Sequence, residues 1–115
     1  MQRDKLFILK SDFVDPAYPD ERFYCWTCVL MEGLLSIFPE LNQKIDVERV
    51  AFQRPRKHVI NLVGEVNQSL PTLVLADDAP LGMETGEHEG IRFVKGKDEI
   101  LNALSQRHNI PIFHP

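Results

Sequence analysis

The sequence FYCWTC, residues 23–28, contains both cysteines of the 115-residue chain and runs directly into the apolar segment VLMEGLLSIF, residues 29–38. The apolar run, which ends before Pro39, predicts a helix that begins close to Cys25. Because the run is apolar on almost every side, we expect this helix to be buried against a sheet. A thiol at a helix N-terminus faces unpaired N–H groups and the positive end of the helix dipole, which both favour the reactive thiolate.

The spacing of the two cysteines indicates a reversible switch between dithiol and disulfide. Cys25 and Cys28 are three residues apart, so on the first turn of a helix they are close enough to bridge with little movement of the backbone. In a cytoplasmic protein, two closely spaced cysteines indicate redox chemistry or a metal more often than a structural disulfide.

The composition excludes several classes of partner. The chain has 13 Lys and Arg against 17 Asp and Glu, a net charge of −4, with no basic run that would bind nucleic acid or an anionic membrane. No apolar segment approaches the roughly 18–20 residues of a transmembrane helix, and the N-terminus lacks the apolar core of a signal peptide. We therefore expect a single cytoplasmic domain, residues 1–115.

The remaining apolar patterns predict alternating strands and helices. Short runs rich in β-branched or other apolar residues predict strands at residues 6–9, 45–52, 70–76 and 91–94. Apolar stripes that follow Pro55 and Asp98 predict two further helices, the last ending near Asn109. The first two strands should pair in parallel and the last two antiparallel, which predicts an α/β domain with a four-stranded mixed sheet flanked by three helices.

Two irregular segments bear on the site and on assembly. Residues 11–22 contain two prolines and four acidic residues, which exclude helix and interior strand. The aromatic residues of this long connection either partly cover the thiols or pin the loop to the core; they are Phe13, Tyr18, Phe23 and Tyr24. The tail, residues 110–115, is apolar enough to dock on the body or on a second subunit, so a homodimer is one expectation.

With this order of elements, three short motifs make the chain resemble the thioredoxin-like fold, closest to its minimal glutaredoxin-like form. CWTC at residues 25–28 lies where that superfamily has a Cys-x-x-Cys motif at the start of the first helix. SLPT at residues 69–72 lies where the superfamily has a cis-proline that opens the third strand. GKDE at residues 96–99 is similar to the glycine-then-acid turn that helps glutaredoxins hold glutathione.

The resemblance implies a thiol–disulfide oxidoreductase and assigns roles to individual residues. Cys25 would be the attacking thiolate and Cys28 the resolving thiol. The substrate, a protein or small-thiol disulfide, would contact the residues between the cysteines and those at the cis-proline, namely Trp26, Thr27, Leu70 and Pro71. No cofactor is required, although glutathione could bind near residues 96–99.

Other interpretations remain open at this stage. Both thiols could be buried as small hydrophobic groups in a non-catalytic thioredoxin-like binding module. Zinc would need two more ligands, and the four histidines are scattered singly, so we expect no metal site. The basic cluster Arg54, Arg56 and Lys57 either holds a glutathione carboxylate or, as we favour, is a solvated face. Trp26 either faces solvent or packs on the long loop.

Overall fold

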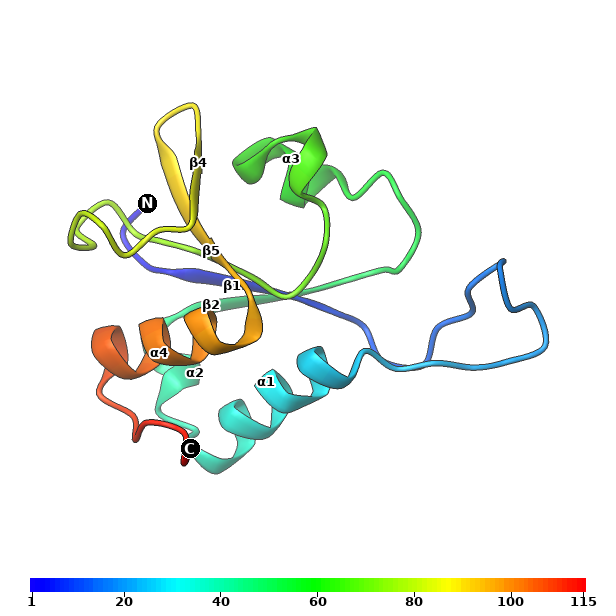
Figure 1. The fold of residues 1–115 in the computed structure, drawn as a ribbon, viewed down its shortest axis with the longest axis horizontal. Coiled ribbons are helices and arrows are strands. Elements are labelled where there is room, and N and C mark those ends of the chain that lie inside the picture. Colours follow the sequence, from blue (N-terminus) through cyan, green and yellow to red (C-terminus); the bar gives the residue numbers. More distant parts are fainter.

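The apolar run at residues 6–9 lies in an interior strand of the sheet, with a neighbouring strand on each side. A computed structural model describes residues 1–115, and in it β1 (Lys5–Leu9) pairs in parallel with β2 (Asp46–Val50) and antiparallel with β3 (Thr72–Val74). Strand β5 (Ile91–Lys95) is antiparallel to β3, and β4 (Gly86–His88) is antiparallel to β5. The sheet therefore has the order β2-β1-β3-β5-β4 (Figure 1).

Helices cover both faces of this sheet. Helix α1 (Trp26–Ile37), the short α2 (Leu41–Lys44) and α4 (Lys97–His108) lie on one face (Figure 1). Helix α3 (Lys57–Val63) and the 3-10 turn η1 (Glu65–Asn67) lie on the other. No helix is long and apolar enough to span a membrane.

Alternation along β1 divides the core into two. Leu6 and Ile8 belong to the larger apolar cluster, which includes residues of α1 and α4. Phe7, between them, belongs to the smaller cluster with Val59 and Val63 of α3. Successive side chains of a strand point to opposite faces, so a continuous apolar run is what a strand covered on both faces requires.

The predicted pairing is confirmed, but the predicted number of elements is wrong. The parallel first pair and the antiparallel β3–β5 pair agree with expectation. However, the sheet has five strands rather than four, and there are four α-helices rather than three.

The two missed elements carry almost no side-chain pattern. Strand β4 has the sequence Gly-Glu-His and lies between the strands predicted at residues 70–76 and 91–94, where no element was predicted. A Cβ on Gly86 would lie 2.6 Å from the Phe93 ring, so glycine permits the close approach of β4 to β5. Helix α2 is a single turn after Pro39 with only Leu41 buried. Because β4 is held by backbone pairing and α2 by one buried residue, neither has the hydrophobic periodicity from which a strand or helix is predicted.

A buried ionic cluster joins the N-terminal segment to the C-terminal helix. Asp4 is 1% exposed, and its carboxylate accepts hydrogen bonds from the Ala76 N–H at 2.7 Å, from His108 Nε2 at 2.7 Å and from Arg107. Burial opposes ionisation of Asp4, but the bonds from His108, Arg107 and Ala76 outweigh it and hold the Asp4 pKa well below its usual range. Asp4 therefore fixes strand β1 against α4 as a carboxylate.

Candidate thiol site

Cys25 is the N-cap residue of α1. Its backbone is extended, with φ −83° and ψ 116°, and its sulfur accepts a hydrogen bond from the Cys28 N–H at 3.3 Å. The Thr27 hydroxyl lies 3.2 Å from the same sulfur. The thiol thus occupies the place of a capping hydroxyl or carboxylate, where unpaired N–H groups of the first turn point at it.

The surroundings of Cys25 favour its thiolate. Partial burial opposes ionisation, but the Thr27 hydroxyl, the Cys28 thiol and the backbone N–H groups of both residues together lower the Cys25 pKa below that of a free cysteine. The side chain is only partly buried. A thiol that is both ionised and accessible has the properties of a nucleophile.

Cys28 has the opposite character. It is 2% exposed, and its sulfur accepts a hydrogen bond from the Leu9 N–H of β1 at 3.3 Å. Burial, and then the neighbouring Cys25, raise the Cys28 pKa to about 12. Both cysteines are free thiols in this structure. The two cysteines, three residues apart, therefore have opposite properties. Cys25 is accessible and its pKa is lowered, whereas Cys28 is buried and its pKa is raised.

Arg56, a cation near the two cysteines, is buried rather than solvated. It is 6% exposed, and its guanidinium donates to the Phe52 carbonyl at 3.1 Å and to the Gln68 carbonyl at 2.8 Å. It forms no ion pair with a carboxylate. Burial, and then Arg54, lower the Arg56 pKa, while Cys28 and Cys25 act in the opposite sense. The prediction that this basic cluster is a solvated face is therefore wrong for Arg56, although Arg54 and Lys57 are exposed.

The proline that the resemblance singled out opens β3 after a cis peptide bond, Leu70–Pro71. Because Thr72 pairs antiparallel with Phe7, the residues just before Thr72 lie toward the Leu9 end of β1, and the Leu9 N–H contacts Cys28. The topology therefore brings the second predicted motif to the same end of the sheet as the cysteines.

Lys95 holds the segment that leads to this proline, and nothing in the sequence singled it out. Its ammonium donates to the carbonyls of Asn67 and Ser69 at 3.0 and 2.7 Å, and to the Thr72 hydroxyl at 2.9 Å. Burial, and then Arg54 and Arg56, lower the Lys95 pKa to about 8. Arg56 also donates to the Gln68 carbonyl. Residues 67–72 are therefore held by two cations, Lys95 of β5 and Arg56.

Trp26, between the cysteines, faces solvent with 66% of its surface exposed. The Lys97 ammonium lies 5.5 Å from the centre of its ring, in a cation–π contact. Tyr24, on the other side of Cys25, is 65% exposed. Of the two alternatives for Trp26, the structure therefore supports the exposed one. Substrate contacts of Trp26, Thr27, Leu70 and Pro71 stay predictions.

The long loop is pinned to the core and extends away from the body (Figure 1). Phe13 and Phe23 exchange two backbone hydrogen bonds, at 2.9 and 2.8 Å, which make a short hairpin. The Phe13 ring stacks on Phe52 with ring centres 4.4 Å apart. Tyr18 and Tyr24 are exposed. The structure therefore favours the reading in which the loop's aromatics pin it to the core over the one in which they cover the thiols.

No group of three or more histidine, cysteine or acidic side chains is placed to hold a metal ion. The glycine-then-acid turn is present, with Gly96 at φ +97° as the N-cap of α4 and with Asp98 and Glu99 in the first turn.

The family model that matches this chain is DUF3088, described as a protein of unknown function, and the match covers residues 3–112. The chain therefore belongs to the DUF3088 family, and the match includes all of the thiol-site residues described above. No curated protein and no solved structure matches the chain.

Proposed function

We propose that the protein is a thiol–disulfide oxidoreductase in which Cys25 attacks and Cys28 resolves. The observation that carries this proposal is the opposed effect of the fold on the two thiols. At Cys25, hydrogen bonds from Thr27 and Cys28 outweigh the effect of burial and lower the pKa. At Cys28, burial dominates and raises the pKa to about 12. An accessible thiolate paired with a protected thiol one turn along a helix is the arrangement that dithiol exchange needs.

In the first step, the Cys25 thiolate attacks one sulfur of a substrate disulfide. The substrate S–S bond breaks, a bond forms between Cys25 and the attacked sulfur, and the other substrate sulfur leaves as a thiolate that takes a proton from solvent. The positive charge of Arg56, which has no carboxylate partner, favours the thiolate form of the nearby cysteines.

In the second step, the Cys28 thiol loses its proton and attacks the Cys25 sulfur. The mixed disulfide breaks, the Cys25–Cys28 disulfide forms, and the second substrate thiolate leaves. Burial is the main cause of the raised Cys28 pKa, and Cys25 adds to it. Forming the mixed disulfide removes the Cys25 charge and so makes Cys28 easier to ionise. The substrate gains two electrons, and a thiol reductant must return them to the protein.

A thioredoxin-like relationship is supported by the topology around this site. The first two strands are parallel, and Pro71 stands directly before β3 at the same end of the sheet as the cysteines. Exposed Trp26 and the backbone of Leu70 are then the contacts for a protein or small-thiol disulfide substrate. Binding of glutathione and a cytoplasmic location are further proposals on the same basis.

Trapping of a mixed disulfide tests this order of events. We expect Cys28→Ser to form a stable adduct through Cys25 with a small disulfide, because the serine hydroxyl can accept the Leu9 N–H but cannot resolve the intermediate. Intact mass and peptide mapping would locate the adduct. Cys25→Ser, with only the buried thiol, should form none. An adduct on Cys28 in that variant, or no adduct in either, would contradict the proposed roles.

A further inference from the structure

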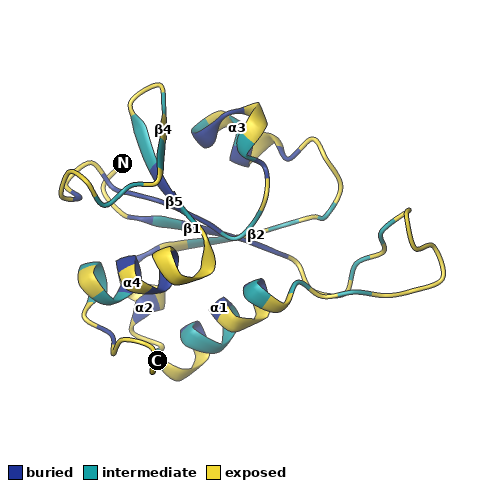
Figure 2. Ribbon diagram, viewed as in Figure 1, coloured by how far each residue is buried: buried dark blue, intermediate teal, exposed yellow.

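The outward face of α1 is apolar and uncovered. The helix buries only Cys28, Met31 and Leu35, so the expectation that it is buried against the sheet holds for that side alone. The residues opposite those three at helical spacing are Trp26, Val29, Leu30, Gly33 and Ile37, and the four large side chains among them are exposed. The ribbon of α1 accordingly alternates between exposed and more buried stretches (Figure 2). The outer face of a surface helix is normally charged or polar.

The single charged residue of α1 does not lie on this face. Glu32 turns to the flank of the helix, where its carboxylate pairs with Arg49 of β2 at 2.7 Å. No residue of α1 therefore places a charge on this face, and the cation beside it is Lys97 of α4, whose ammonium lies over the Trp26 ring. We call this outward surface the α1 face, defined by Trp26, Val29, Leu30, Gly33 and Ile37.

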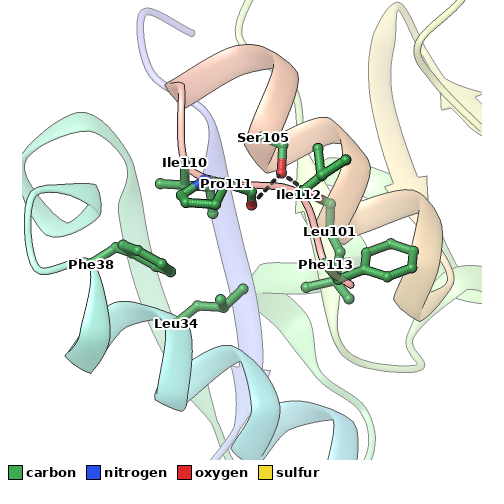
Figure 3. A pocket seen from close by; sticks show the side chains of 8 residues that line it. All are labelled: Leu34, Phe38, Leu101, Ser105, Ile110, Pro111, Ile112 and Phe113. Atoms are coloured by element: carbon green, nitrogen blue, oxygen red, sulfur yellow. Dashed lines mark hydrogen bonds between the residues drawn. The ribbon is translucent and has the colours of Figure 1, made fainter. Parts of the chain in front are cut away.

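An apolar groove lies beside the α1 face. Leu34 and Phe38 point into it from the end of α1, Leu101 and Ser105 line it from α4, and the tail, residues 110–113, crosses it (Figure 3). Its cavity of about 130 Å³ has room for one large side chain. Exposed Ile112 and Phe113 extend the apolar surface.

Six of the twelve large apolar side chains that the chain exposes belong to the α1 face and the tail. Monomeric proteins rarely expose an apolar patch larger than a few hundred Å² unless it binds something. The clustering therefore indicates an interface.

We propose that a second copy of this chain covers the α1 face, with the two α1 helices antiparallel and crossing at Gly33. Each chain carries a net charge of −4, so two copies approach most easily through a surface to which α1 contributes no carboxylate. No atom lies within 4 Å of where a Cβ on Gly33 would be. A partner helix can therefore come close at that point.

The arrangement of side chains about Gly33 is self-complementary. Val29 lies four residues before Gly33 and Ile37 four residues after it. In an antiparallel pair related by a twofold axis at Gly33, Val29 of each copy meets Ile37 of the other, as an interface between identical surfaces requires. Trp26 lies at the edge of this contact and adjoins Cys25, so association restricts access to the thiol. The proposal does not depend on the redox function.

Sedimentation equilibrium over a wide range of protein concentration tests the proposal. We expect reversible monomer–dimer association in the wild type. Ile37→Glu should raise the dissociation constant by about tenfold or more, because it leaves an unpaired charge in an apolar contact. Gly33→Leu should weaken association similarly while the monomer accommodates it, because the space around Gly33 is open. Val66→Glu is the matched control, since Val66 is 92% exposed on η1, across the sheet from α1.

Wild-type protein that stays monomeric at every concentration would overturn the proposal, whatever other protein binds the α1 face. So would a dimer that is unaffected by both Ile37→Glu and Gly33→Leu, or one that Val66→Glu weakens equally. The alkylation rate of Cys25 gives a separate reading, and we expect it to fall as dimer forms. A monomer with a reactive Cys25 would contradict the dimer alone. A protein that dimerises but whose Cys25 stays inert at concentrations where it is monomeric would contradict the function alone.

Discussion

Replacing Cys25 by serine is expected to reduce the protein's disulfide-reducing activity to the background rate of the reagent. The remaining thiol, Cys28, is 2% exposed, and burial, the largest cause of its raised pKa, persists when Cys25 is replaced, so it supplies almost no thiolate at neutral pH. The measurement is the rate at which reduced protein cleaves a small aromatic disulfide, followed by the absorbance of the released thiolate.

The serine variant is a clean test because the fold should tolerate it. Serine is among the preferred N-cap residues, so its hydroxyl can accept the Cys28 N–H in place of the sulfur and preserve the start of α1. Circular dichroism and unfolding midpoint should therefore match the wild type. Cys28→Ser is the complementary control, which should react once and stop. Substantial activity in a folded Cys25→Ser variant would rule out Cys25 as the nucleophile.

Asp4→Asn is expected to lower the free energy of unfolding at neutral pH by about 3 kcal/mol, the lower part of the range for removing one partner of a buried ion pair. The change leaves the Arg107 guanidinium, with a side chain 13% exposed, without its buried carboxylate. It also weakens the bond to His108 that joins β1 to α4. Urea unfolding at pH 7 measures the difference.

The pH dependence gives this prediction a second readout. Because the folded state holds the Asp4 pKa below its usual range, the carboxylate contributes stability above the unfolded pKa of about 3.9 and loses it as pH falls. The gap between wild type and Asp4→Asn should therefore be full at neutral pH and shrink in acid. Asp78→Asn removes a carboxylate that also bonds Arg107 but is 79% exposed, so it should cost far less. Equal losses from the two variants would contradict the assigned role of Asp4.

The sequence predicted those parts of the fold that depend on local apolar pattern. The run at residues 6–9 identified β1 because a strand covered on both faces has no polar alternation. Asn109 was predicted to end the last helix, and it is the left-handed C-cap of α4 with φ 59°. Strand β4 was missed because it is held by backbone pairing to β5 and has no apolar residue of its own.

The sequence located the two thiols of the candidate site but not the side chains that surround and support them. The spacing of Cys25 and Cys28 contained the information that one thiol caps the helix and the other lies one turn inside it. Arg56 was misread because an arginine in a basic run is usually solvated, and its burial depends on carbonyls of Phe52 and Gln68 that only the tertiary fold brings together. Lys95 gave no signal for the same reason.

The outward face of α1 shows where a correct local pattern led to a conclusion that holds for one side of the helix only. A helix that is apolar on nearly all sides is normally buried, and we expected this one to be buried against the sheet. The sheet covers only the side that contains Cys28, Met31 and Leu35. Within one chain nothing covers the other side, so the pattern is better explained by a partner than by the core.

The rate of Cys25 alkylation as a function of pH, measured on reduced Cys28→Ser protein, tests the central claim most directly. The Cys25 sulfur keeps the Thr27 hydroxyl and its backbone N–H donors in this variant, so the rate should rise through a transition below the free-thiol value of about 8.5. Labelling should proceed without denaturant, because Cys25 is only partly buried. A transition at or above the free-thiol value, or labelling only after unfolding, would contradict the oxidoreductase proposal.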